Sequence, residues 1–219
     1  MTTGFIASQS VTFLTALALV TTLGMLAFRN VNLLLRAYGA QSMLLGVAAA
    51  VISLSPGRHH VLPVALITIA VKGLWIPYYL QKVIANVRMK RELDPAVSYQ
   101  VSVLCGVGLV LLSYAAVEPF AAIDGFAARG FGLALAIMQL GLWLMVGRRK
   151  AVTQAIGLLV VENGLLAAAI STGFGMPMVV ELGLAFDLLV AVVIIGMLII
   201  RIRTAFSSMD TEHLNRLRG

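Results

Sequence analysis

The sequence predicts an all-α, polytopic membrane protein with about seven transmembrane helices. Of its 219 residues, 60% are hydrophobic and 11% are charged, whereas roughly a quarter of the residues in a soluble domain are charged. The apolar residues gather in seven runs long enough to cross a bilayer, which takes about 20 residues each. A net charge of +7 could indicate a nucleic-acid partner, but the basic residues are confined to short loops between the apolar runs. Membrane topology requires that pattern, so we expect contact with the lipid bilayer and no nucleic acid.

The first three predicted spans lie in the N-terminal part of the chain. The first runs from about residue 4 to 28, and the segment that opens it lacks the basic stretch of a cleaved signal peptide. The second, from 30 to about 54, ends at Ser55-Pro56-Gly57. The third, from about 61 to 85, contains Pro77, which cannot donate a helical hydrogen bond. We therefore expect a kink in this span.

The fourth span, from about 96 to 117, follows the basic loop RMKRELDP. Asp94 as N-cap and Pro95 at the first helical position favour a helix start there. Proline and glycine interrupt the next stretch, EPFAAIDGF, so we expect it to lie along the outer interface. The remaining spans are expected at about 127–146, 151–172 and 176–200, before a polar tail.

The distribution of basic residues predicts the orientation. Thirteen of the 16 Lys and Arg residues fall on one side of the predicted spans, together with the C-terminal tail. The positive-inside rule places that side in the cytoplasm, so the N-terminus is expected outside and the C-terminus inside.

An internal repeat is also predicted. When the second and sixth spans are aligned on their basic turns, Gln41-Ser42 falls on Glu162-Asn163, and Lys72 then falls within one residue of Asp187. Spans one to three and five to seven would form two three-helix units of the same orientation, because a single linking helix keeps them parallel. The predicted division is residues 1–86 for the first unit, 87–126 for the basic loop, linking helix and interfacial segment, 127–203 for the second unit, and 204–219 for the cytoplasmic tail.

Acidic residues at bilayer depth are the main candidates for function, because each costs a few kcal/mol or more to bury in lipid. Glu162 and Asp187 lie near the middle of their spans, and Glu181 lies near the outer end of the last one. Polar contacts between membrane helices average only about 0.6 kcal/mol, so packing alone is a poor reason to keep a carboxylate. We interpret Glu162 and Asp187 as protonation sites. A structural role, with hydrogen bonds to backbone or to a neighbouring Ser or Asn, stays open for both.

Lys72 lies eleven residues into its span, too deep to reach the interface easily. A lysine that exchanges carboxylate partners would suit a proton relay, and Gln41 and Gln139 could extend a hydrogen-bonded path. Arg36 is equally compatible with function and with interfacial anchoring.

No motif in the chain indicates catalysis. It has no glycine-rich phosphate loop, no nucleophile with a base, and no Cys or His cluster with metal-ligand spacing, and its one cysteine, Cys105, lies inside an apolar helix. We therefore expect no catalytic residue, cofactor or metal in this subunit.

Several runs of residues resemble those of a known family. GLLVVENGLLAAAI, VVELGLAFDLLVAVVIIGMLIIRIR and the final MDTEHLNRLRG resemble component E of hydrogenase-4, as do AYGAQS and VKGLWIP in the first half. The C-terminal third is also similar to the K-type subunit of respiratory complex I and to the C subunit of multisubunit cation/proton antiporters. Those subunits carry an acidic residue in each of two helices, and Glu162 and Asp187 are the matching positions. Gln41 and Lys72 hold these places in the first unit, so the first unit cannot be assumed to relay protons in the same way.

The resemblance implies a non-catalytic subunit of a complex-I-like assembly in a bacterial cytoplasmic (inner) membrane. There a peripheral nickel–iron hydrogenase with its iron–sulfur subunits, often coupled to a formate dehydrogenase, docks on a hydrogenase-proximal membrane subunit and antiporter-like membrane subunits. The K-type carboxylates belong to a lateral chain of charged residues. Three alternatives stay open: a structural adaptor between antiporter-like subunits, a subunit of a multisubunit cation/proton antiporter, or a stand-alone transporter with parallel repeats.

Overall fold

The computed structural model describes residues 2–55, 58–86, 97–120 and 125–172. Every regular element in these ranges is a helix, which confirms the predicted all-α class. The elements are α1 (Thr2–Ala27), α2 (Val31–Ser53), η1 (His59–Val61), α3 (Leu62–Ile67), η2 (Thr68–Trp75), α4 (Ile76–Asn86), α5 (Tyr99–Val117), η3 (Glu118–Phe120), α6 (Gly125–Val146) and α7 (Ala151–Thr172).

Six helices in the described ranges are long and apolar enough to cross a membrane. They agree with six of the predicted spans, within a few residues at most ends, and cover Ala7–Ala27, Val31–Ser53, Leu62–Lys82, Tyr99–Val117, Arg129–Val146 and Val152–Ser171. The predicted seventh span, which carries Glu181 and Asp187, lies outside the described residues, as does the C-terminal tail.

A side-chain cap sets the start of α2, whereas the start of α5 has no side-chain capping hydrogen bond. The Asn30 side chain accepts a hydrogen bond from the Asn32 backbone N–H at 2.9 Å, which caps the start of α2. Helix α5 starts at Tyr99 with Ser98 in the N-cap position, later than the start predicted at Asp94-Pro95. That dipeptide lies outside the described residues.

The third span departs from α geometry where the sequence predicted only a kink. Its middle is η2, an eight-residue π-helix, which ends two residues before Pro77. The backbone N–H of Ile76 donates to the Val71 carbonyl, five residues back, as π geometry requires. Pro77 has no N–H with which to continue the ladder in either register. The disturbance is therefore a change of helix type just before the proline.

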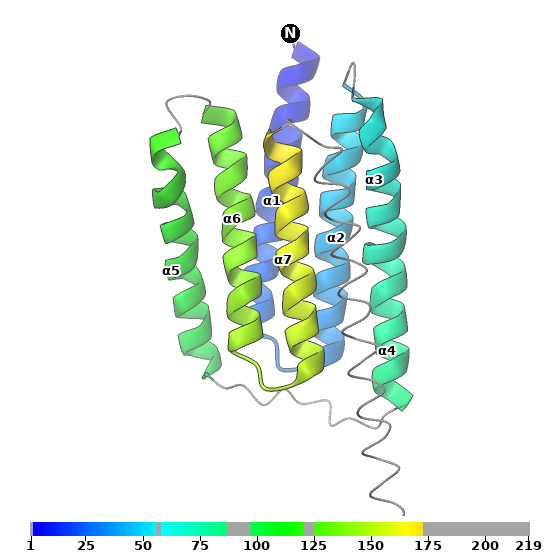
Figure 1. Ribbon diagram of the computed structural model, residues 1–219, viewed down its shortest axis with the longest axis vertical. Coiled ribbons are helices and arrows are strands. Elements are labelled where there is room, and N and C mark those ends of the chain that lie inside the picture. Colours follow the sequence, from blue (N-terminus) through cyan, green and yellow to red (C-terminus); the bar gives the residue numbers. More distant parts are fainter. Residues whose placement is uncertain (1, 56–57, 87–96, 121–124, 173–219) are drawn as a thin grey trace, which may run out of the picture.

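Four helices form the centre of the bundle, and the others flank it (Figure 1). Helix α6 packs against α7 and α1, while α2 packs against α1 and α7. Helix α5 lies at one edge against α6 and α1, and the α3–η2–α4 span lies at the opposite edge against α2. The first two helices of the predicted first unit therefore lie beside their aligned counterparts, α6 and α7.

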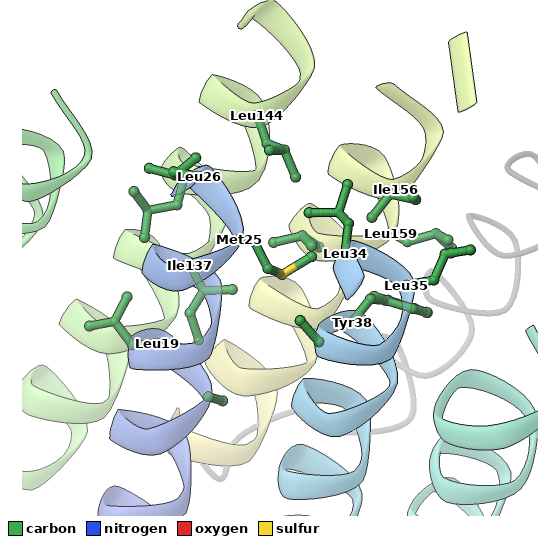
Figure 2. Close-up of a cluster of buried hydrophobic side chains, with 14 of the residues drawn as sticks. Leu19, Met25, Leu26, Leu34, Leu35, Tyr38, Ile137, Leu144, Ile156 and Leu159 are labelled. Atoms are coloured by element: carbon green, nitrogen blue, oxygen red, sulfur yellow. The ribbon is translucent and has the colours of Figure 1, made fainter. Parts of the chain in front are cut away.

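The core fills the space between α1, α2, α6 and α7. Figure 2 shows side chains of these four helices pointing toward a common interior, with Met25 of α1 facing the start of α2. The largest fully buried side chains come from the same helices and include Met25, Tyr38, Leu45, Ile137, Leu140, Ile156 and Leu159. Lipid is as apolar as leucine, so close fit rather than exclusion of water must hold such helices together.

Glycine supplies that close fit between α6 and α7. A Cβ atom added to Gly141 would lie 2.9 Å from the Gly157 carbonyl oxygen, and a Cβ added to Gly157 would lie 2.9 Å from that of Gly141. Real Cβ atoms essentially never approach so closely. The two backbones therefore touch at a point where only glycine fits, as small residues allow in membrane bundles.

Arg148 fastens the end of the bundle where the α1–α2 and α6–α7 connections lie. Its Nη2 donates to the carbonyl oxygens of Leu26 (3.0 Å) and Phe28 (3.2 Å), at the last turn of α1. Its guanidinium also lies 5.1 Å from the centre of the Tyr99 ring, and that of Arg29 lies 4.8 Å from it. Burial lowers the pKa of the Arg148 guanidinium, and a hydrogen bond with Tyr99 opposes that shift. One arginine thus joins α1, α5 and the α6–α7 connection.

Candidate functional site

A buried ion pair connects η2 to α7. Lys72 Nζ lies 2.5 Å from Glu162 Oε1, and the two side chains are 7% and 1% exposed. A charge buried in a medium of low dielectric constant is costly unless it is paired, so the contact offsets part of the cost of burying each group. Among the residues whose burial the structure describes, Arg148 is the one further buried Lys, Arg, Asp or Glu, and it belongs to the loop end of the bundle. The pair is therefore the charged centre of the described core.

Lys72 stands on the π-helical stretch, an uncommon geometry often found at functional positions. The next residue, Gly73, lies against α2. A Cβ atom on Gly39 of α2 would lie 2.8 Å from the Gly73 carbonyl oxygen, and a Cβ on Gly73 would lie 2.9 Å from Met43 Cγ. Side chains at either glycine would push η2 away from α2. These glycines therefore bring Lys72 deep enough to reach Glu162.

A set of neutral polar groups lies beside the pair. Asn163 Nδ2 donates to Gln41 Oε1 (3.1 Å) and to Ser42 Oγ (2.8 Å), and Gln41 Nε2 donates to Thr22 Oγ1 (2.6 Å). Thr22 Oγ1 in turn donates to the Ala18 carbonyl oxygen of its own helix at 2.7 Å. The four side chains are at most 1% exposed. Asn163 directly follows Glu162, so the network fixes the turn of α7 that carries the carboxylate.

The structure brings together three of the six residues that the sequence singled out for a proton path. Lys72 and Glu162 form the ion pair, and Gln41 bonds to Asn163, the residue that follows Glu162 in α7. Gln139 does not join this group: its Oε1 accepts a hydrogen bond from Ser113 Oγ on α5 at 3.1 Å. The other two predicted residues lie outside the described ranges.

Three residues of the network were not predicted as site residues. Asn163 and Ser42 entered the sequence argument only as aligned neighbours of Glu162 and Gln41, although two adjacent polar residues inside an apolar run were a usable signal. Thr22 gave no signal, because a threonine in a membrane helix can satisfy its own hydroxyl on the carbonyl four residues back, as Thr15 also does. Within the part of the chain that the structure describes, no group of three or more His, Cys, Asp or Glu residues could hold a metal ion.

The helical bundle, its six membrane-length spans and its buried charges define a multi-pass, all-helical membrane protein. The chain is 33% identical over 179 residues to an uncharacterised protein of Mycobacterium tuberculosis (strain ATCC 25618 / H37Rv), Rv0085, which covers 79% of this chain and 81% of that protein. It is 26% identical over 220 residues to hydrogenase-4 component E of Escherichia coli (strain K12), covering 97% and 99% of the two chains, and the Shigella flexneri component E matches with the same figures. No protein-family model and no solved structure matches the chain. The chain belongs to the same family as the mycobacterial protein, and it is similar to hydrogenase-4 component E over almost its whole length.

Proposed function

We propose that this chain is a non-catalytic membrane subunit of a membrane-bound hydrogenase complex, such as a formate hydrogenlyase, and that Lys72 and Glu162 belong to its proton path. Similarity to hydrogenase-4 component E over 97% of the chain supports the first part. The buried ion pair carries the second part. A carboxylate and a lysine buried in a bundle of membrane-length helices are costly enough that packing alone does not account for them.

The pair can hold a proton on either group without a change in net charge. Transfer of a proton from the Lys72 ammonium to the Glu162 carboxylate leaves a neutral amine and a carboxylic acid. At 2.5 Å, the attraction in the ionic form is about 7 kcal/mol for an effective dielectric constant of about 20. Thermal energy is about 0.6 kcal/mol, so the pair stays closed until another charge competes for one of its members. A proton arriving on a neighbouring group would be such a competitor.

The π-helical stretch provides a structural means to open the pair. A π turn holds more residues than an α turn, and α geometry advances about 100° per residue. Conversion of η2 to α geometry would therefore rotate Lys72 relative to one end of its span. The outward side chains Leu74 and Trp75 are 55% and 59% exposed, and the Trp75 ring stacks on that of Tyr79 in α4 with centroids 5.4 Å apart, so this face is held mainly by contacts within its own span.

The rest of the path is assigned by alignment. Asp187 falls within one residue of Lys72 in the repeat alignment and is proposed as the next protonation site, with Glu181 nearer the outer end of the same predicted span. We place the complex in a bacterial cytoplasmic membrane, with the N-terminus outside and the C-terminus inside. Its proposed partners are antiporter-like membrane subunits, a hydrogenase-proximal membrane subunit and peripheral hydrogenase and iron–sulfur subunits.

A second candidate function is that of a structural adaptor that holds antiporter-like subunits in register. The backbone contact of Gly141 with Gly157 favours it, because such packing makes a stiff helix pair. If the adaptor is correct, substitution of Glu162 leaves pumping unchanged, while deletion of the chain disperses the complex.

Purification of the tagged chain from its own membrane in a mild detergent tests the subunit assignment. We expect hydrogenase, iron–sulfur and antiporter-like subunits to co-purify, together with hydrogen-dependent reduction of a viologen dye. Antiporter-like subunits alone would favour a cation/proton antiporter. A stable homo-oligomer without partners would contradict the proposal and favour a stand-alone transporter.

A further inference from the structure

Two amide side chains, Asn163 and Gln41, stand in the network beside the ion pair, and neither can pass a proton onward. Asn163 Nδ2 donates to Gln41 Oε1, and Gln41 Nε2 donates to Thr22 Oγ1, whose own hydroxyl donates to the Ala18 carbonyl. The chain of hydrogen bonds therefore starts beside Glu162 and ends on the backbone of α1. A relay must accept a proton on one side and release one on the other. Amide side chains have no ionisable proton to release, whichever way their oxygen and nitrogen are assigned.

The polar groups of the network lie away from the solvent-accessible surface. Gln41, Ser42 and Asn163 are 0% exposed, and Thr22 is 1% exposed. The ionisable group that meets Glu162 in the described core is Lys72, which stands on the other side, on η2. A proton on Glu162 therefore has the ionisable Lys72 on the side of η2 and two neutral amides on the side of α1.

From these observations we propose that Gln41 and Asn163 form a non-titrating barrier that confines the proton of the Lys72–Glu162 pair and blocks its escape toward α1. The proposal rests on the proposed proton-path function and adds a direction to it. In the repeat alignment, Gln41 stands where the second unit has Glu162. An amide at this position accepts the hydrogen bond from Asn163 and fills the space of a carboxylate, but it cannot take up the proton. The difference between the two units thus specifies which side conducts.

The test replaces the amide of Gln41 by the carboxylate of the same shape. Gln41→Glu puts an ionisable group between Asn163 and Thr22, so it should open a route toward α1. In membrane vesicles that contain the whole complex, we expect a faster passive proton leak after an imposed pH step and fewer protons pumped per hydrogen turned over. The pH change is followed with a fluorescent amine dye. Gln139→Glu is the matched control, because it makes the same change on α6 beside Ser113, outside the network. It should not produce this leak.

Two further variants keep the test decisive. Asn163→Asp replaces the other amide and should give the same leak, so it covers the case in which Gln41→Glu fails to assemble, as judged on native gels. Glu162→Gln in the same vesicles separates the two proposals. Suppose that Glu162→Gln abolishes pumping, while the assembled Gln41→Glu and Asn163→Asp variants show the same leak rate and the same pumping as the unchanged protein. The barrier is then wrong and the proton path stands. If Glu162→Gln also pumps normally, the proton path itself is wrong.

Discussion

Removal of one member of the Lys72–Glu162 pair should destabilise the bundle far more than removal of an exposed ion pair. The two groups lie 2.5 Å apart with side chains 7% and 1% exposed. The attraction of about 7 kcal/mol is largely offset by the several kcal/mol that each ion loses when it leaves water. The complete pair therefore adds little net stability. A single substitution, however, leaves the other group buried without its described partner, which costs about 3–5 kcal/mol.

A double-mutant cycle measures this coupling. Lys72→Met, Glu162→Gln and the combined variant would be compared with the unchanged protein in reversible unfolding experiments in mixed micelles. We expect each single substitution to lower the free energy of unfolding by about 3–5 kcal/mol, and the combined variant to lose clearly less than the sum of the two. Losses below about 1 kcal/mol for both single variants, which are typical of exposed pairs, would show that the pair is hydrated and would refute the reasoning.

Two further substitutions test how the site is held. Gly39→Ala places a Cβ 2.8 Å from the Gly73 carbonyl oxygen in η2. The stability of the protein in detergent should therefore fall by about 1–3 kcal/mol. Gly108→Ala is the control and should be nearly neutral, because no atom lies within 4 Å of the added Cβ. Thr22→Val removes the acceptor of a buried amide N–H and should cost about 1–3 kcal/mol in the same assay. Its neighbour Thr21 is partly exposed, and its hydroxyl donates to the Leu17 carbonyl of its own helix, so Thr21→Val is the control. If Thr21→Val costs as much, the buried hydrogen bond of Thr22 has no special weight.

The spans and the deep polar residues could be predicted from the sequence because lipid imposes strong rules on composition. A run of about 20 apolar residues has few alternatives to a membrane helix, and a polar residue at its centre stands out. Lys72 and Glu162 were recognised in this way, and both lie in the described core. The sequence did not predict that these two residues pair, because a contact across 90 positions depends on how helices pack. The predicted repeat drew attention to Asp187, which falls within one residue of Lys72 in the alignment, and named no specific partner for either.

Local backbone geometry was less predictable. Pro77 indicated a disturbance, but the loss of a donor does not decide between a kink and a change of helix type. The π-helix precedes the proline and carries Lys72, in a stretch where α2 offers glycines for close approach. Gln41 was predicted to extend a hydrogen-bonded path, and it does bond on both sides. The direction of those bonds, which end on a backbone carbonyl, is a property of the packed structure.

The proton yield of the Glu162→Gln variant tests the central claim most directly. Vesicles with the assembled complex would be supplied with its hydrogen-linked substrates, and protons moved would be counted for each hydrogen produced or consumed. Glutamine keeps the shape of the Glu162 side chain, whose Oε1 lies 2.5 Å from Lys72 Nζ, but it has no ionisable proton. We predict that hydrogen turnover continues while the number of protons moved falls toward zero. Full proton transfer with turnover intact would contradict the role of the Lys72–Glu162 pair in the proton path.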